Sequence, residues 1–345
     1  MSGSDGSRYL RGRGVGTILL AIMVALAACQ PLGEGEDEGE DEPTGSGPAA
    51  SGGGDAGTGR LSIATGGTGG VYFPLGGGLA DLITENVEGY TATAEETNAS
   101  VDNMNLIGSG DSDIAFVLGD TASDAVAGTG DFEGGAIEAC ALGFIYTNFT
   151  QLVASADSGI TGVADLEGKR VSLGEAGSGT EIIGLRILEA AGLDPDADID
   201  RAQLGVAETV DALRDGTLDA GFWSGGLPTG ALVDYASTGD MVLVPTGEFT
   251  ADLQGTYGEY YLESEIPADS YEGQTDVVPV VGVPNVLVVN TSMDEALQEQ
   301  LTALLFDHKD DLVAVHPAAE ELDQEIASDV PFMDVCPGAQ TFYGS

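Results

Sequence analysis

The chain has few side chains of the kinds that carry out redox, metal or nucleic-acid chemistry. Its 345 residues include 3 Cys, 2 His and 1 Trp, and 10 Lys and Arg stand against 58 Asp and Glu, for a formal net charge of -48. Binding to phosphate backbones needs clustered basic residues, so this balance excludes a nucleic-acid-binding protein. Zinc enzymes and thiol redox proteins need histidines and cysteines, so both are disfavoured as well.

Hydrophobic residues, in contrast, are present in ordinary amount. They make up 42% of the chain, and aliphatic runs recur from Leu61 to the C-terminus, which argues against a disordered protein. At roughly 150 residues per domain, the length predicts about two domains. The acidic excess predicts a strongly hydrated surface.

Residues 1–28 have the pattern of a secretory signal peptide. Three arginines within the first 14 residues precede an apolar run from Val15 to Ala28, which is short for a transmembrane span. The run ends in Leu26-Ala27-Ala28-Cys29, which resembles the lipobox of bacterial lipoproteins and implies lipidation of Cys29. We therefore expect an extracytoplasmic protein anchored by lipid to the outer face of the cell membrane. A plain signal peptide with a chance cysteine is the alternative.

Residues 29–59 are expected to form a disordered tether. The stretch from Glu34 to Glu42 is almost entirely acidic, and a Gly-, Ser- and Ala-rich stretch follows it. Like charges at this density repel one another and extend the chain, and nothing in the segment can form a core.

From Leu61 onward, short apolar strands alternate with helical patterns, which predicts an α/β protein with mostly parallel sheets. A strand at 61–64, a glycine loop at 65–70 and a helix at 71–86 are repeated as a strand at 171–173, a loop at 174–179 and a helix at 180–191. Each half then continues with the motif G-x-x-D-x-[AG]-F, beginning at Gly110 and at Gly216. The period is too long for a stacked repeat, so we expect two lobes with a ligand cleft between them.

Two long strand-like runs, 140–155 and 277–289, are expected to connect the lobes. Lobe 1 is then predicted to comprise residues 59–146 plus 276–345, and lobe 2 residues 147–275. A helix over 294–314 and a short helix around 318–327 are expected to pack back on lobe 1.

The two glycine loops are the predicted ligand site. In an open α/β sheet the ligand binds at the carboxyl ends of the strands, where glycine lets the backbone approach closely and helix N-termini attract anions or carbonyls. The spacing of the glycines does not match two other glycine-rich motifs, the dinucleotide-binding fingerprint and the P-loop. Tyr72 stands where a dinucleotide fingerprint needs glycine, and Lys169 is followed by Arg170 where a P-loop needs Ser or Thr.

Several motifs together resemble the TAXI family, the substrate-binding subunits of one class of TRAP transporters. They are Thr65-Gly-Gly-Thr-Gly-Gly-Val-Tyr-Phe-Pro-Leu-Gly-Gly, Thr97-Asn-Ala-Ser100, the stretch from Gly110 to Asp120, Gly177-Ser-Gly-Thr180 and His316-Pro-Ala-Ala319. The resemblance covers roughly residues 60–345. It implies a two-lobed periplasmic-binding-protein type II fold, in which each lobe is a mostly parallel sheet flanked by helices.

The same resemblance implies a solute-binding protein that is not an enzyme and has neither cofactor nor metal. It would capture a small organic solute, a carboxylate such as glutamate or 2-oxoglutarate, and deliver it to an ion-gradient-driven TRAP permease in the membrane. We expect a monomer with no nucleic-acid partner. By matching positions, the ligand would contact Thr65, Gly66, Gly67, Thr68, Gly69, Gly70, Tyr72, Asn98 and Ser100 in lobe 1, and Gly177, Ser178, Gly179, Thr180 and Trp223 in lobe 2.

The roles of some side chains stay open. Tyr72 and Trp223 could stack on the ligand or serve as core aromatics. Arg170 begins a strand and is expected at the end away from the cleft, and Arg186, two turns into its helix, is expected to cover the outer face. An anionic ligand would therefore rely on backbone N–H groups and hydroxyls.

With Cys29 lipidated, Cys140 and Cys336 remain as an even pair in an oxidising compartment. We favour a disulfide between them over two buried thiols.

Three alternatives to the TRAP assignment remain. The chain could be the binding component of an ABC importer, or a surface antigen or structural lipoprotein without a transport role. A lipoprotein hydrolase that uses Ser178 as nucleophile would need a base near it, and the sequence offers no candidate.

Overall fold

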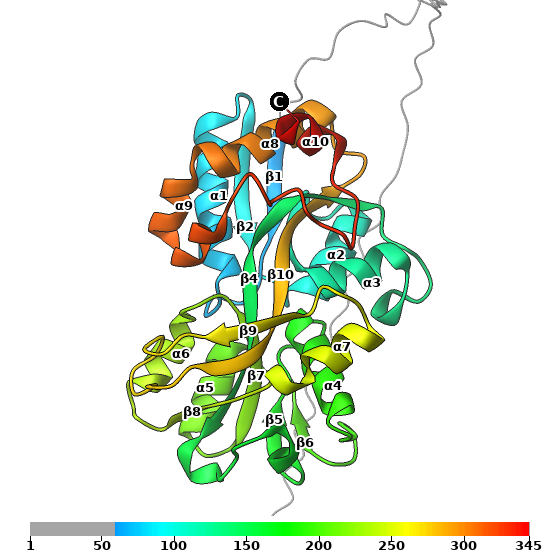
Figure 1. Cartoon of the computed structure of the whole chain (residues 1–345). Coiled ribbons are helices and arrows are strands. Elements are labelled where there is room, and N and C mark those ends of the chain that lie inside the picture. Colours follow the sequence, from blue (N-terminus) through cyan, green and yellow to red (C-terminus); the bar gives the residue numbers. More distant parts are fainter. Residues whose placement is uncertain (1–58, 345) are drawn as a thin grey trace, which may run out of the picture. The chain divides into compact units, whose positions relative to one another are not determined.

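Two long strands join the two halves of the described part of the chain, residues 59–344 of the computed structural model (Figure 1). β4 (Ala139–Ser155) and β10 (Val278–Asn290) pair antiparallel over most of their length. Both are almost continuously buried, which explains why they read as unbroken apolar runs rather than as an alternating pattern. The predicted signal peptide, the lipidation at Cys29 and the tether lie outside the described residues.

Lobe 1 is the upper half in Figure 1 and has the strand order β2-β1-β3-β10-β4. In this sheet β1, β2 and β3 are parallel, and β10 runs antiparallel to both of its neighbours. The elements of this lobe, besides parts of β4 and β10, are β1 (Gly59–Ala64), β2 (Tyr90–Glu95), β3 (Ile114–Leu118), α1 (Tyr72–Asn86), α2 (Ser100–Ser109), α3 (Gly119–Ala127), α8 (Glu295–Asp307), α9 (Lys309–Val315) and α10 (Pro337–Tyr343).

Lobe 2 continues the same sheet through β7-β5-β6, which are parallel, while β8 pairs with β4 and β9 with β10. Its elements are β5 (Arg170–Ser172), β6 (Asp200–Ala202), β7 (Ala220–Gly225), β8 (Met241–Val244), β9 (Leu262–Ile266), α4 (Gly179–Ala190), α5 (Val206–Arg214), α6 (Gly230–Ala236) and α7 (Thr250–Thr256). The predicted two-lobed α/β fold is confirmed. The limits of the lobes at 146 and 276 stay a prediction, because β4 and β10 pass between the lobes without interruption.

The repeated motif G-x-x-D has the same structural role in both lobes. Asp113 Oδ2 accepts a hydrogen bond from the backbone N–H of Ser62 in β1 at 2.8 Å. Asp219 Oδ2 accepts one from the backbone N–H of Arg170 in β5 at 2.9 Å. Each aspartate therefore ties the start of one strand to a parallel neighbour, which explains why both halves need this residue at this position.

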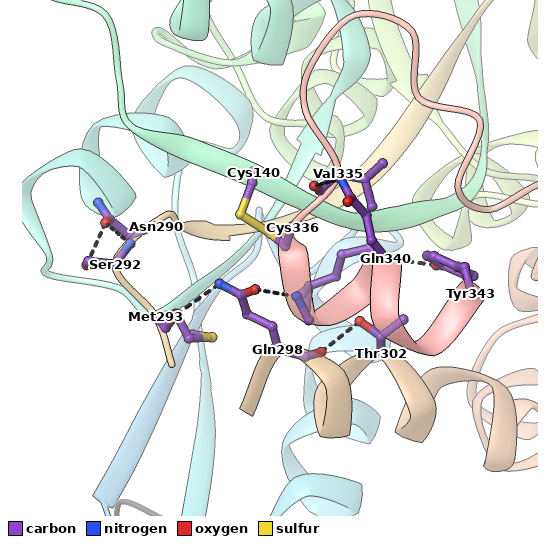
Figure 2. Close-up of a disulfide and its surroundings, with 12 residues drawn as sticks. Cys140, Asn290, Ser292, Met293, Gln298, Thr302, Val335, Cys336, Gln340 and Tyr343 are labelled. Atoms are coloured by element: carbon purple, nitrogen blue, oxygen red, sulfur yellow. Dashed lines mark hydrogen bonds between the residues drawn. A yellow bond between two sulfur atoms is a disulfide. The ribbon is translucent and has the colours of Figure 1, made fainter. Parts of the chain in front are cut away.

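A disulfide closes the edge of lobe 1. Cys140 at the start of β4 is bonded to Cys336, which immediately precedes α10, and the two residues are 196 positions apart in the sequence (Figure 2). Beside the disulfide, Gln298 of α8 holds α10, because its side-chain oxygen accepts a hydrogen bond from Gly338 N at 3.0 Å. The C-terminal helix is thus attached to lobe 1 both covalently and by hydrogen bonds.

The C-terminal helices differ from the prediction. The expected helix over 294–314 is broken at His308 into α8 and α9, and the expected helix around 318–327 is reduced to a 3-10 turn over Pro317–Glu321. His316 is extended, with φ -152° and ψ 132°, because the proline that follows it disfavours helical geometry at this position. None of the helices in residues 59–344 is long and apolar enough to cross a bilayer.

Candidate functional site

The glycine loop of lobe 1 leads from β1 into α1 and is held from behind by a buried asparagine. Asn103 Nδ2 donates to the carbonyl oxygen of Thr65 at 2.7 Å and to that of Phe116 at 2.8 Å. Thr97 Oγ1 donates to the same Thr65 carbonyl at 3.1 Å. Thr65 is fully buried, so it anchors the loop and leaves the residues after it to face the cleft.

The loop of lobe 2 leads from β5 into α4 and is fixed by the helix it starts. Ser178 Oγ accepts a hydrogen bond from Glu181 N at 3.1 Å, which caps the helix. The carboxylate of Glu181 in turn accepts one from Gly177 N at 2.8 Å. Gly177 has φ +77°, a left-handed conformation that favours glycine.

The glycine loop of lobe 2 contacts lobe 1 across the cleft. The carbonyl oxygen of Gly177 accepts hydrogen bonds from the backbone N–H groups of Val101 and Asp102, at the N-terminus of α2, at 3.2 Å each. A side-chain carbon at Gly179 would lie 2.5 Å from Leu118 Cδ1 and 2.9 Å from Ser100 Oγ. Glycine is therefore needed at 179 because the lobes approach too closely for a larger residue, and the lobes are closed on one another.

A pocket remains between the closed lobes, with about 450 Å³ of space that no atom fills, part of it open to solvent. It is lined by Gly66, Gly67, Gly70, Val71, Tyr72, Ala99, Ser100, Leu118, Tyr146, Asn148, Glu175, Ser178, Thr180, Trp223, Ser224 and Gly225. The room that it leaves for water-sized molecules is about 30 Å³, and its lining combines apolar walls with a few polar groups, as is usual for small-molecule sites.

The predicted site residues fall into two groups. Those that line the pocket are Gly66, Gly67, Gly70, Tyr72, Ser100, Ser178, Thr180 and Trp223. The others are Thr65, Thr68, Gly69, Asn98, Gly177 and Gly179. Of these, Thr65 and Gly177 support the loops, Gly179 packs against the facing lobe, and Asn98 is exposed. Thr68 and Gly69 line a neighbouring hollow.

A chain of buried amides and hydroxyls crosses the floor of the pocket. Tyr72 Oη donates to the side-chain oxygen of Asn285 in β10. Asn285 Nδ2 donates to Asn148 Oδ1 in β4 at 2.8 Å, and Asn148 Nδ2 donates to the carbonyl oxygen of Ser224 in β7 at 3.1 Å. Burial raises the pKa of Tyr72, so its hydroxyl stays protonated. This series of hydrogen bonds connects α1 of lobe 1 to β7 of lobe 2 through both connecting strands.

Two hydroxyls in the pocket wall have no hydrogen-bond partner among residues 59–344. Tyr146 Oη and Ser224 Oγ are both buried and unpaired. Tyr146 is fully buried and Ser224 is 5% exposed. Leaving a buried polar atom unpaired costs about 1–3 kcal/mol, so these two hydroxyls have unused capacity for a bound molecule.

A second, acidic hollow adjoins the pocket and has room for water-sized molecules of about 30 Å³. Its lining includes Glu96 from lobe 1 and Glu175 and Glu208 from lobe 2, together with Trp223. Burial, followed by the charges of Glu208 and Glu96, raises the pKa of Glu175 to about 7. Glu175 and Trp223 line both spaces, so the acidic hollow and the pocket share one wall.

Arg186 lies between the lobes rather than on the outer face, so the prediction for this residue was wrong. Its side chain is 12% exposed, and its guanidinium pairs with Asp124 of α3 at 2.5 Å and lies 3.6 Å from Asp120 Oδ2. Tyr261 Oη donates to Asp120 Oδ2 at 2.9 Å. The helical position was read correctly, but the facing lobe covers that side of α4, and only the tertiary structure could reveal this.

Sequence reasoning missed several residues that line the pocket or hold its lining residues in place. Asn148, Tyr146 and Asn285 lie in the two connecting strands, where the apolar pattern suggested only hydrophobic core. The polar residues within these otherwise apolar runs were the available signal, because a buried amide in a strand needs specific partners. Glu175 was also missed, although it lies within the predicted glycine loop.

The chain matches the model of a protein family and is similar to several solved structures. The model of the NMT1-like family matches residues 63–344. The chain is similar to the periplasmic aliphatic sulphonate binding protein SsuA from Escherichia coli, at 18% identity over 79% of this chain and 80% of that chain, with a TM-score of 0.43. It is also similar to a ligand-binding component of an ABC-type import system from Staphylococcus aureus, at 13% identity over 82% and 89% of the two chains, with a TM-score of 0.46.

Proposed function

This chain belongs to the NMT1-like family, and on that basis we propose that it is an extracytoplasmic solute-binding protein that delivers a small organic solute to a membrane transporter. The observation that carries the proposal is the pocket between the two glycine loops, one from each lobe. Closure of two lobes over a pocket suits reversible capture, because separating the lobes would release the ligand. The buried hydroxyls of Tyr146 and Ser224 support it further.

The transporter we propose is an ion-gradient-driven TRAP permease, which rests on the TAXI-like motifs of the sequence. The alternative is an ABC importer. Neighbouring genes would separate the two, because a TRAP system needs a large multi-spanning permease and an ABC importer needs an ATPase. The carboxylate expected from the resemblance stays a prediction. In this pocket it would have to be bound by backbone N–H groups and hydroxyls, since neither Lys nor Arg is among the lining residues.

Anchoring at Cys29 is part of the same proposal. Replacement of Cys29 by Ser should release the protein from the membrane or leave its signal peptide uncleaved. Metabolic labelling with a radioactive fatty acid would test this, because the wild-type chain should incorporate the label and the variant should not. Labelling of the variant would contradict lipidation at Cys29.

A hydrolase that uses Ser178 has little support from the geometry. Ser178 Oγ is engaged in capping α4. Both histidines of the chain are in contact with other groups: His308 Nδ1 lies 2.9 Å from Asp311 Oδ2, and His316 Nδ1 accepts from Ala318 N at 3.1 Å. We therefore propose no catalytic role for Ser178.

The sole tryptophan of the chain, Trp223, lines the pocket and gives a direct readout of binding. We expect a small molecule to co-purify with the folded protein and to be identified by mass spectrometry after denaturation. Adding it back to stripped protein should change the fluorescence of Trp223 and give a measurable heat in calorimetry. If no molecule co-purifies and a broad solute library changes neither signal, the surface-antigen alternative is favoured.

A further inference from the structure

Every basic side chain in residues 59–344 is placed outside the pocket and the adjoining hollow. Each has a partner elsewhere: Arg60 pairs with Thr93, Lys169 with the Ser158 carbonyl, Arg170 with Asp219, Arg186 with Asp124, Arg201 with Glu181, Arg214 with Asp211, and Lys309 with the Glu320 carbonyl. The site therefore has no cationic side chain with which to balance an anionic ligand.

The charged groups that do face the site are carboxylates, and they converge. A side-chain carbon at Gly205 would collide with Glu175 Oε1 and lie 2.7 Å from Glu208 Oε2. A side-chain carbon at Gly67, across the cleft, would lie 3.1 Å from the same oxygen of Glu175. Glu175 and Glu208 thus approach the same point beside Gly205. Two neighbouring carboxylates repel one another unless a proton or another cation lies near them.

Trp223 and the unpaired hydroxyls complete the site. The indole is held by a hydrogen bond from its Nε1 to Thr229 Oγ1 at 3.0 Å, and it lines both the pocket and the acidic hollow with Glu175. An indole ring beside a carboxylate attracts a cation, because the ring face and the carboxylate are both negative. Tyr146 and Ser224, buried and unpaired, line the same pocket and supply hydrogen bonds for the rest of a molecule.

We propose that the solute carries a positively charged nitrogen, which binds between the carboxylate of Glu175 and the ring of Trp223. This inference rests on the proposed function as a solute-binding protein and narrows its substrate class to amines, amino acids and related zwitterions. Deaminated acids such as 2-oxoglutarate are expected to bind weakly, since they bring only negative charge to an acidic site. Hydrogen bonds to Tyr146 and Ser224 orient the uncharged or carboxylate end of the solute.

The binding of a cationic nitrogen should depend on pH. Glu175, with Glu208 of α5 and Glu96 after β2 facing it, has a pKa raised to about 7 in the absence of ligand. A positively charged ligand favours the ionised carboxylate, so affinity should increase as the pH rises from 5.5 through 7 and level off near 8. This dependence should disappear in Glu175→Gln, provided that the ammonium group of the probe stays charged over the range.

The experiment compares matched pairs of probes with the mature chain purified in detergent. Trp223 fluorescence and calorimetry would be followed for L-glutamate against 2-oxoglutarate, L-leucine against 4-methyl-2-oxopentanoate, and putrescine and glycine betaine. We expect at least one nitrogen-bearing probe to bind, and a deaminated counterpart, where there is one, to bind at least tenfold more weakly. Glu175→Gln should weaken binding of that probe at least tenfold, while Glu263→Gln, an exposed change on β9, should leave it unaltered.

The outcomes separate this inference from the proposed function. Equal or tighter binding of the 2-oxo acids, a co-purified solute without a positively charged nitrogen, or undiminished binding in Glu175→Gln would overturn the inference and leave the solute-binding function intact. Absence of binding by every probe, together with absence of a co-purified molecule, would overturn both. Circular dichroism and thermal unfolding of Glu175→Gln establish that any loss is not caused by misfolding.

Discussion

The two lobes share one plan but contribute different chemistry to the cleft. In each, a strand leads through a glycine loop into a helix, and an aspartate of the repeated motif ties neighbouring strands together. Lobe 1 presents backbone and small residues of the loop after Thr65 together with the uncharged ring of Tyr72, and its carboxylate Glu96 lines only the adjoining hollow. Lobe 2 presents Glu175 and Trp223. The difference teaches that the repeated framework sets the position of the cleft, whereas the selectivity that we propose comes mainly from lobe 2.

The helix starts differ in the same sense. α4 is capped by the side chain of Ser178, whereas α1 begins after Val71 without a side-chain cap. The first N–H groups of a helix need partners from outside the helix. In lobe 2 the protein supplies one itself, and in lobe 1 the end of the helix is better suited to receive a ligand or water.

The first prediction concerns the ion pairs of Arg186 in lobe 2 with Asp120 and Asp124 in lobe 1. Arg186→Met should destabilise the closed protein by about 3–5 kcal/mol, because it leaves Asp120 fully buried without its cation. Burial raises the pKa of Asp120, so the loss should be larger at pH 8 than at pH 5, where protonation removes the uncompensated charge. Urea unfolding at the two pH values measures this.

A matched control lies within lobe 2. Arg170→Met removes a more exposed pair, in which the arginine side chain is 41% and that of Asp219 23% exposed, so its cost should stay near or below about 1 kcal/mol. Equal losses in the two variants would show that the pair between the lobes has no special role in closure.

The second prediction tests the covalent reinforcement that lobe 1 has. Replacing Cys140 and Cys336 by Ser should lower the free energy of unfolding by about 2–5 kcal/mol, because the unfolded chain loses a long closed loop. Hydrogen exchange should increase chiefly in α8, α10 and the start of β4, and much less in lobe 2. Reductant should destabilise the wild type and leave the double variant unchanged. A uniform increase of exchange over both lobes would contradict a local role.

The third prediction concerns the close approach of Gly179, in the lobe 2 loop, to Leu118 and Ser100 of lobe 1. Gly179→Val should hinder closure, because its side chain would occupy the space of Leu118 and Ser100. We expect at least tenfold weaker ligand binding, about 1.4 kcal/mol, with little change in unfolding of the ligand-free protein. Gly230→Ala is the control, since no atom lies within 4 Å of the added carbon. Unchanged affinity in Gly179→Val would mean that the lobes need not close this far.

The smallest expected effect comes from replacing either of two neighbouring glycines of α1 in lobe 1, Gly76 and Gly77, by alanine. Gly77→Ala should stabilise the protein by about 0.5–1 kcal/mol, because the added carbon meets no atom within 4 Å and alanine favours the helix. Gly76→Ala should be destabilising, since its added carbon would collide with Thr65 Cγ2 beneath the site loop. Thermal unfolding distinguishes the two, and stabilisation by both would show that the loop can shift without cost.

Much of the framework could be predicted from the sequence because it is encoded locally. The helix after the first glycine loop was expected over 71–86 and is observed over Tyr72–Asn86. The apolar spacing of a helix and a proline in its first turn are local signals that do not depend on the rest of the fold. The connecting strands could also be predicted from a local signal, because a strand that is buried on both faces is apolar throughout.

The contacts between distant segments could not be predicted in this way. Nothing near Arg186 in the sequence indicates that Asp120 and Asp124 would cover it. The buried positions of Asn148 and Asn285 likewise depend on the pairing of β4 with β10. Such contacts arise from the register and packing of segments far apart in the chain.

The sequence by itself determined two α/β lobes, their glycine loops and the shortage of basic groups, because composition and local periodicity express these directly. Only the tertiary structure decided which groups meet in the cleft. Glu175, Trp223 and the unpaired hydroxyls come together there because the lobes close, and the charge of a site depends on which side chains share a small volume rather than on their order along the chain.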